Sequence, residues 1–442
     1  MPAYVRRSSA IAEIAGASPT IEAFRTCALS PYSRMHVPSF RVSDEIIAYV
    51  SPDSTYAVTK RLIDAATKSI EIGIYDFTAE YMKTLLLNAL SRKVKVTVML
   101  DVESVAGEDR LFQELIEMGV QGVPAPACTS KKAHFFSSCH EKFIVIDRTW
   151  TLVQSGNYSN NSIPLNEKDG GDPQRFVKGN RDSGLAIKSK SMARFFAKVL
   201  HSDIALELDT PESELVVPPP APEALWVEAA PKLIPKKLFP SKTFKVTAPL
   251  KVQPVLSPDN YMNVIPDVLR SAKKGILIEQ QYIRADEEQI GALLRAVRAA
   301  MDLQPALDVR IVLGKIFGAE QIADEQRNLD LLKSNYGLAL GKNVRYIDTK
   351  RFVHCHNKMI VIDGETVLVS SQNWSNFAVT KNREAGLLLT HKGIGKYFST
   401  VFENDWETAL TKLPQPSSPS VGPEELEQGG YIQVVPADYR AV

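Results

Sequence analysis

Two short stretches of the chain carry the residue types needed for nucleophilic and acid–base chemistry on a phosphate. His140 is followed two residues later by Lys142, and His356 is followed in the same way by Lys358. In an extended strand, residues two apart point to the same face. Each stretch is therefore expected to present an imidazole, which can attack phosphorus or move a proton, beside an ammonium that binds phosphate oxygens.

Further polar residues follow each stretch, the serines and asparagines at matching distances. Serine and asparagine can donate hydrogen bonds to phosphate oxygens, and a carboxylate can accept one from an imidazole N–H and fix its tautomer. The candidates are Ser155, Asn157 and Asp182 in the first half, Ser371, Asn373 and Glu384 in the second, and Asp147 and Asp363 closer to the histidines. We expect each carboxylate to serve the histidine of its own half, so that His356 pairs with Glu384.

If the two stretches meet about a pseudo-twofold axis, they form one pocket for a tetrahedral anion. One imidazole then attacks phosphorus while the other protonates the leaving oxygen. The lysines supply the positive charge that a cation would otherwise supply, so we expect no metal and no cofactor. This set of residues predicts phosphodiester cleavage through a covalent phosphohistidine.

The doubled His-x-Lys-x-x-x-x-Asp pattern with a trailing Ser-x-Asn resembles the phospholipase D superfamily. The resemblance covers nearly all of residues 45–410. It implies that His140 is the nucleophile and that His356 is the general acid and later the base for water. It also implies roles for the other residues: phosphate binding by Lys142, Lys358, Asn157 and Asn373, orientation of the histidines by Asp182 and Glu384, and a structural role for Asp147 and Asp363.

The chain departs from the pattern of that superfamily at one position in each half. The glycine that usually opens the segment before the asparagine is Gln154 in the first half and Ser370 in the second. This difference is expected to reshape the phosphate pocket while leaving every charged group in place.

The elements around these residues are also duplicated. Ser51-Pro52-Asp53 recurs as Ser257-Pro258-Asp259, and each copy is followed by a helical pattern, an apolar strand, a second helical pattern and a second strand. Strands and helices alternating at this spacing indicate parallel pairing with crossover helices. We predict an α/β fold of two phospholipase D-like halves, each a sandwich with a mixed central sheet and helices outside, packed as a pseudo-dimer.

The repeat and the proline content divide the chain into five segments. Residues 1–44 have no repeat partner and form an appendage, and nine prolines between residues 205 and 250 indicate a linker. The predicted segments are the appendage 1–44, the first half 45–204, the linker 205–250, the second half 251–412 and a tail 413–442.

Composition excludes several classes of protein. The 442 residues carry 52 Lys and Arg against 51 Asp and Glu, which gives no basic excess of the kind that favours a nucleic-acid partner. No apolar stretch is long enough for a transmembrane helix, and residues 1–24 lack the apolar core of a secretory signal. We therefore expect a cytoplasmic protein, with peripheral contact to a membrane.

Cysteine and histidine offer two alternative interpretations of the motif regions. The four cysteines, Cys27, Cys128, Cys139 and Cys355, are too few and too scattered for a disulfide framework. Cys139 and Cys355 adjoin the motif histidines, where small packing residues are favoured over a redox switch. His354 and His356 invite a metal site, but Ser138 stands opposite His354 in the first half and no ligand set appears there.

The sequence leaves the identity of the phosphodiester open. The first candidate is hydrolysis of a glycerophospholipid head group at a membrane surface, with possible transfer to an alcohol. The alternatives are a nuclease, a cardiolipin synthase-like phosphatidyltransferase and a non-enzymatic scaffold. The even charge counts against the nuclease, and two halves in one chain favour a monomer whose single site acts on lipid.

Overall fold

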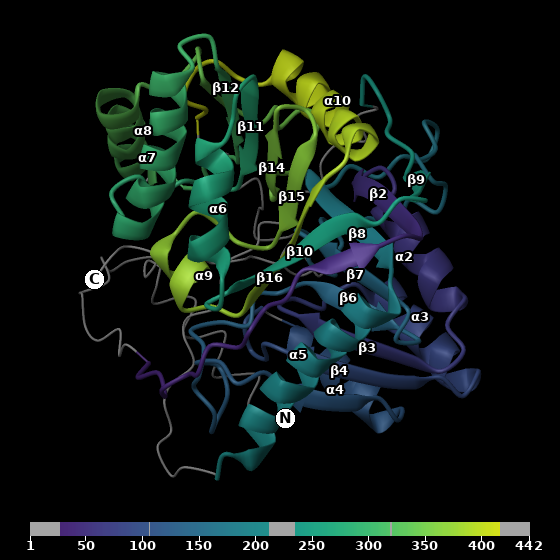
Figure 1. The fold of residues 1–442 in the computed structure, drawn as a ribbon. Coiled ribbons are helices and arrows are strands. Elements are labelled where there is room, and N and C mark those ends of the chain that lie inside the picture. The colour runs from purple at the N-terminus through teal and green to yellow at the C-terminus, as the bar shows by residue number, and fades with distance from the viewer. Residues whose placement is uncertain (1–26, 106, 212–234, 319–320, 416–442) are drawn as a thin grey trace, which may run out of the picture.

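The computed structural model describes residues 27–105, 107–211, 235–318 and 321–415. They form two mixed eight-stranded sheets with helices, as the duplicated sequence predicts (Figure 1). The sheet of the first half has the order β5 (Gln121–Pro124), β4 (Lys95–Leu100), β3 (Ser69–Ile74), β6 (Phe143–Ile146), β7 (Trp150–Gln154), β8 (Asp182–Lys188), β2 (Glu45–Ser51) and β9 (Lys242–Lys245). In this sheet β3, β4 and β5 are parallel and the other neighbours are antiparallel.

The sheet of the second half repeats this arrangement. Its order is β13 (Val344–Tyr346), β12 (Asp308–Leu313), β11 (Gly275–Gln280), β14 (Lys358–Ile362), β15 (Thr366–Ser370), β16 (Glu384–Thr390), β10 (Leu250–Ser257) and β1 (Phe40–Val42). Strands β11, β12 and β13 are parallel and the other neighbours are antiparallel. The matching orders confirm that the two halves share one fold.

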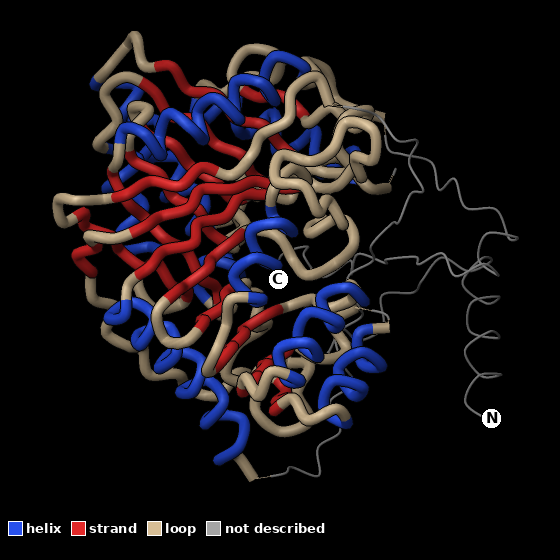
Figure 2. The backbone as a smooth tube through the Cα atoms, turned by 90° about the vertical axis from the view of Figure 1, so that its right-hand side faces the viewer, coloured by secondary structure: helices blue, strands red, loops and turns tan. Residues whose placement is uncertain are grey.

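Helices cover the outer faces and flank a core that the two halves share (Figure 2). The outer helices of the first half are α2 (Thr55–Asp64), α3 (Glu80–Ser91) and α4 (Glu108–Glu117), and those of the second are α6 (Tyr261–Arg270), α7 (Glu288–Leu303), α8 (Ile322–Tyr336) and α9 (Asn376–Thr380). Helices α5 (Lys190–Asp209) and α10 (Lys392–Thr408) contribute to the shared core instead. The prediction of helices outside each sheet did not foresee that α5 and α10 pack into the core shared by the halves.

Local sequence explains these elements in simple terms. Strand β6 reads Phe-Ile-Val-Ile and all four of its residues are buried, which β-branched and aromatic side chains favour in a central strand. Helix α5 begins after Ser189, whose hydroxyl accepts a hydrogen bond from the backbone N–H of Met192. That bond satisfies one of the free donors at a helix start.

Each half adds a strand to the sheet of the other half. Strand β1, which precedes the first half, pairs with β10 of the second, and Phe40 lies opposite Val252. Strand β9, which precedes the second half, pairs with β2 of the first, and Ile46 lies opposite Phe244. In Figure 1 the purple segment accordingly crosses to β10. Strand β1, within the predicted appendage, thus has a counterpart in β9, contrary to the prediction.

The exchange is supported by two buried arginines that join the halves. Arg181 of the first half lies 2.6 Å from Asp405 of the second and 2.9 Å from Asp53 of its own half. The repeated counterpart is Arg383, which lies 2.7 Å from Asp203 and 2.5 Å from Asp259. All six side chains are at most 4% exposed. A buried charge without its partner costs several kcal/mol, so neither half can keep its arginine satisfied alone.

The predicted linker and tails differ in part from the structure. Helix α5 continues to Asp209, past the predicted start of the linker at 205, and β9 occupies residues 242–245 within it. Residues 1–26, 212–234 and 416–442 lie outside the described residues, so the appendage, linker and tail are described only in part.

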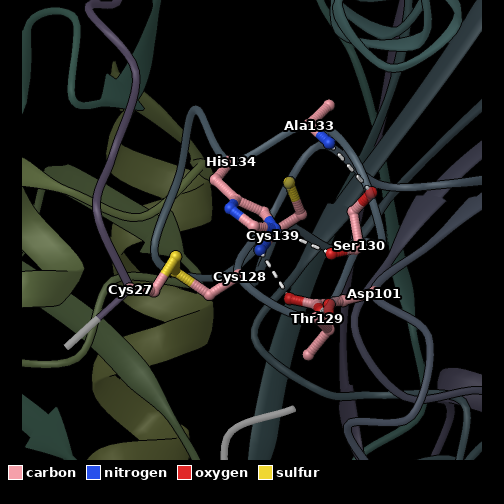
Figure 3. The surroundings of a disulfide bond; sticks show 8 residues. All are labelled: Cys27, Asp101, Cys128, Thr129, Ser130, Ala133, His134 and Cys139. Carbon is pink, nitrogen blue, oxygen red and sulfur yellow. Dashed lines mark hydrogen bonds between the residues drawn. A yellow bond between two sulfur atoms is a disulfide. The ribbon is translucent and has the colours of Figure 1, made fainter. Parts of the chain in front are cut away.

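One disulfide, between Cys27 and Cys128, ties the described start of the chain to the loop after β5. Figure 3 shows that loop, in which the Ser130 hydroxyl accepts a hydrogen bond from the backbone N–H of Ala133. The backbone N–H of Ser30 also donates to the carbonyl of His134. The sequence-based expectation of no disulfide framework did not foresee this single bond, because pairing of residues 101 positions apart depends on the fold.

No helix within the described ranges is both long enough and apolar enough to span a bilayer.

The buried arginine clusters lead to a stability prediction. We expect Asp405→Ala to lower the free energy of unfolding by about 3–5 kcal/mol, because it leaves the Arg181 guanidinium buried without its partner from the other half. The matched control is Asp64→Ala, which removes the exposed ion pair with Lys60 and is expected to cost less than about 1 kcal/mol. Urea unfolding followed by fluorescence measures both, and equal costs would contradict an energetic role for the cluster.

Candidate active site

The two motif stretches meet at the interface of the halves. His140 and Lys142 immediately precede β6 (Phe143–Ile146), while His356 precedes β14 and Lys358 begins it. The centroids of the His140 and His356 rings lie 6.5 Å apart. The structure therefore brings both imidazoles to one place, as the sequence predicts.

Each histidine is bound by a carboxylate of the other half. Nδ1 of His140 lies 2.9 and 3.0 Å from the two carboxylate oxygens of Glu384. Nδ1 of His356 lies 3.0 Å from Oδ1 of Asp182. The expected pairing of His356 with Glu384 within one half is therefore wrong.

The cause of the crossed pairing is a backbone bridge between the halves. The N–H of Arg383 donates to the carbonyl of Ser138, and the N–H of His140 donates to the carbonyl of Arg383. The residue after Arg383, Glu384, is thereby placed beside His140. The same bridge joins Arg181 to the segment just before β14, which contains His354 and His356.

The carboxylates fix the orientation of both rings. A neutral imidazole that donates its Nδ1–H to a carboxylate keeps an unprotonated Nε2 for chemistry. Burial, followed by the charges of Lys142 and Lys358, lowers the pKa of His140 well below its usual value. Burial and then Lys358 lower the pKa of His356 to about 4, although Asp182 opposes this shift. Both rings are thus neutral at physiological pH before an anion binds.

The two lysines are fully buried beside the histidines. Nζ of Lys142 donates to the backbone carbonyl of His140 at 2.5 Å, and Nζ of Lys358 donates to that of His356 at 2.5 Å. Each bond fixes the position of an ammonium next to its motif histidine. Lys142 also lies 5.1 Å from the centroid of the Tyr75 ring, which in turn lies 4.8 Å from the His140 ring.

The two serines hold the carboxylates and are not directed at a substrate. The hydroxyl of Ser155 donates to Asp182 at 2.8 Å, and that of Ser371 donates to Glu384 at 2.5 Å. Since each hydroxyl has one proton, the expectation that these serines donate to phosphate is wrong in this structure. They act on the histidines through the carboxylates.

The two asparagines lie beside the site with little exposure, 6% each. Nδ2 of Asn157 is 3.4 Å from Asp76, the second residue after β3. The Oδ1 atoms of Asn157 and Asn373 are buried without a hydrogen-bond partner within the described part of the chain.

Asp147 and Asp363 hold the motif strands to the sheet at the end away from the histidines. Asp147 accepts hydrogen bonds from the backbone N–H groups of residues 67–69, and Asp363 accepts them from those of residues 273–275. Both aspartates have a left-handed backbone, with φ of 51° and 54°, which Asp tolerates better than most residues. They therefore anchor a turn and lie outside the chemistry.

The residues that replace the usual glycine have local partners. Nε2 of Gln154 donates to the carbonyl of Gly156, and the hydroxyl of Ser370 donates to that of Lys358. The first bond lies within the segment that leads to Asn157, whereas the second joins β15 to the motif lysine at the start of β14.

The remaining cysteines and His354 border the site. Cys139 and Cys355 are buried free thiols whose pKa values burial raises well above the usual one. His354 accepts a hydrogen bond at Nδ1 from the backbone N–H of Lys315. In the described residues, no group of three or more histidine, cysteine or acidic side chains is arranged to hold a metal ion.

Sequence reasoning missed several residues that the site uses. Tyr75, Arg181 and Arg383 all contact site residues or their backbone. A signal for the arginines was present, since each precedes a site carboxylate in the repeated Asn-Arg-acid sequence. Tyr75 has Gln281 at the equivalent place, so the repeat could not identify it.

Comparisons with known proteins give the family and similar folds. The family model described as "Cardiolipin synthase, PLD-like domain" matches residues 59–204 and 265–406, more than half of the chain. The structure is similar to phosphatidylserine synthase of Haemophilus influenzae Rd KW20, with a TM-score of 0.58, 14% identity, and coverage of 89% of this chain and 93% of that chain. Nuc, a phospholipase D family member of Salmonella typhimurium, is 18% identical over 38% of this chain and 98% of its own, with a TM-score of 0.31. A search of curated protein sequences gives no match.

The crossed pairing can be tested by titration. Because the Asp182 carboxylate raises the pKa of His356, Asp182→Asn is expected to lower that pKa still further below about 4. The pKa of His140 should change much less, since its carboxylate is Glu384. NMR titration of the imidazole nitrogens measures both values. A large shift of His140 with an unchanged His356 would instead restore pairing within each half.

Proposed function

The chain belongs to the cardiolipin synthase, phospholipase D-like family, and we propose that it is a phospholipase D-type phosphodiesterase. Its substrate is a glycerophospholipid, and the reaction proceeds through a phosphohistidine. The observation that supports this most is the pair of imidazoles 6.5 Å apart, each held at Nδ1 by a carboxylate of the other half. That arrangement leaves both Nε2 atoms for one phosphorus between them.

In the first step, Nε2 of His140 attacks phosphorus and the bond from phosphorus to the leaving oxygen breaks. His356 is the proton donor for that oxygen, and Asp182 stabilises its protonated form. A bound phosphodiester brings a negative charge next to His356, which raises its pKa and lets it take up the proton it must give. Lys142 and Lys358 neutralise charge on the phosphoryl oxygens.

In the second step, water attacks the phosphohistidine and His356 accepts its proton. The N–P bond to His140 breaks, and the phosphate monoester leaves. An alcohol in place of water gives a new phosphodiester by the same steps, so transfer is the second candidate activity. The family description, which names cardiolipin synthase, favours testing it.

Two features favour a lipid over a nucleic acid as the substrate. Near-equal numbers of acidic and basic residues give no general attraction to nucleic acid. One chain supplies both motifs, so a monomer at a membrane surface has a complete site. A substrate panel that compares release of choline, ethanolamine, glycerol and nucleotide, with and without an added alcohol, separates hydrolase, transferase and nuclease.

The division of labour between the histidines can be tested with single variants. We expect His140→Ala to abolish the covalent phosphoryl-enzyme, since it removes the attacking nitrogen. His356→Ala should lower turnover of an ordinary substrate by about 10²–10⁴-fold, because the general acid is lost. With a nitrophenyl leaving group, which needs no proton, this variant should still form the adduct and keep it.

Mass spectrometry of the intact protein at neutral pH detects the adduct. An adduct on His356 in the His140→Ala protein would reverse the assignment. Normal turnover in either variant would remove the phosphohistidine mechanism.

Charge neutralisation by Lys142 and Lys358 predicts that the reaction needs no divalent cation. We expect a chelator to leave the rate on a soluble phosphodiester unchanged, whereas Lys358→Met should lower it. The soluble substrate avoids effects of cations on lipid surfaces. Loss of activity with the chelator, restored by one particular divalent ion, would point to a metal in the reaction.

A further inference from the structure

The two walls of the site differ in charge although their backbones correspond. The second residue after the first strand of the parallel trio is Asp76 in one half and Tyr282 in the other. The two residues after the next strand are Asp101 and Val102 in one half and Gly314 and Lys315 in the other. Each difference makes the wall of the second half less negative or more positive.

In the first half, the carboxylate of Asp101 accepts hydrogen bonds from the donors that lie next to the motif. It accepts hydrogen bonds from the hydroxyls of Ser138 and Thr129 and from the backbone N–H of Cys139. Ser138 is the residue two before the motif histidine, and its only hydroxyl proton is used in this way.

In the second half, the corresponding position before the motif holds His354. Its ring fills the space beside Gly314: a Cβ atom built on Gly314 would lie only 2.1 Å from Cε1 of His354. Glycine at this place is therefore what allows the imidazole to lie there, where the first half has Asp101.

The tautomer of His354 follows from a hydrogen bond at its Nδ1 atom. Nδ1 accepts a hydrogen bond from the backbone N–H of Lys315 at 3.0 Å, so it carries no proton. Burial, followed by the charges of His356 and Lys315, lowers the pKa of His354 well below its usual value. The neutral ring must then carry its proton on Nε2. This N–H is buried and has no hydrogen-bond partner within the described residues.

The position of this donor places it at the site. Residues 354, 356 and 358 alternate along one extended segment, so their side chains share a face. The ring of His354 lies 6.5 Å from that of His356. A buried donor without an acceptor is unfavourable, and a bound oxygen atom would remove this cost.

We propose that His354 and Lys315 form a subsite for a second anionic group, a carboxylate or a further phosphate, next to the phosphate held by the two motifs. This inference rests on the proposed function and names its substrate class. Nε2–H of His354 donates to an oxygen of that group, and the Lys315 ammonium, 5.1 Å from the Phe317 ring centroid, supplies charge. Asp76 and Asp101 repel the group from the opposite wall, which orients the substrate.

Two matched pairs of soluble ligands test the subsite without turnover. Phosphate and pyrophosphate differ by a phosphate in line with the first. O-phosphoethanolamine and O-phosphoserine differ by a carboxylate on the head group. Calorimetry on the full chain should give at least about tenfold tighter binding of the second member in one of the pairs. Which pair responds tells whether the anionic group belongs to a diphosphate or to a head group.

Three variants distinguish a hydrogen bond from Nε2–H of His354 from a general effect of positive charge. His354→Asn keeps an acceptor near the place of Nδ1 but lacks the Nε2–H, so the affinity ratio of the responding pair should fall to about one. His354→Gln, whose amide can donate near the place of Nε2, should keep part of the ratio. Lys315→Met should lower the ratio as well. His201→Asn, at an exposed histidine of α5 whose ring contacts Glu71, is the control and should leave the ratio unchanged.

The possible failures are distinguishable. If phosphate binds the unaltered protein but both pairs give ratios of one, the subsite is wrong and the proposed function stands. A high ratio that persists in His354→Asn also overturns the subsite. If none of the four ligands binds, the phosphate pocket of the proposed function is wrong, and the subsite fails with it.

Discussion

The structure depends on one reciprocal interaction, in which an arginine–carboxylate dipeptide of each half binds the motif strand of the other. Arg383 exchanges backbone hydrogen bonds with Ser138 and His140, and the next residue, Glu384, then reaches the His140 ring. Arg181 and Asp182 do the same for the segment that contains His356. The contact that joins the halves is therefore the contact that orients the imidazoles, and a correctly docked interface is a condition for a correctly formed site.

Other contacts across the interface also require the two halves to pack together. The guanidinium of Arg181 is neutralised by Asp405 from α10 of the other half, and that of Arg383 by Asp203 from α5. Charges buried this deeply are tolerated only with their partners in place. Strands β1 and β9 are also exchanged between the sheets, and α5 and α10 line a common core. The chain is thus best regarded as one cooperative unit with two sequence repeats, because neither half contains all the partners of its own buried groups.

The sequence was informative where the two repeats agree and silent where the fold brings unlike segments together. Repeated spacing sufficed to predict the mixed sheets and the meeting of His140 with His356, since equal sequences fold alike. It could not show that Glu384 serves His140, because pairing across a pseudo-twofold axis has no signature in either repeat alone. The prediction that Ser155 donates to phosphate failed for a different reason: Asp182 lies in the same half, but sequence alone does not show that the Ser155 hydroxyl donates to it. The exchanged strand β1 was missed because three residues carry too short a pattern.

Each half also buries one carboxyl group beneath its motif, but the two carboxyl groups come from different positions in the repeat. In the second half Glu279 of β11 accepts a hydrogen bond from Asn357, the residue between the motif histidine and lysine. In the first half the same two places hold Gly73 and Glu141, and a Cβ on Gly73 would lie 3.0 Å from the Glu141 carboxylate. A buried carboxyl group is therefore present beneath each motif but comes from opposite strands, and burial raises the pKa of both Glu141 and Glu279. Where a change at one position is matched by a change at its neighbour, as with these carboxyl groups, the two halves remain chemically equivalent. Where it is not, as with Asp101 against Gly314 and Ser138 against His354, the two halves place different side chains next to their motifs.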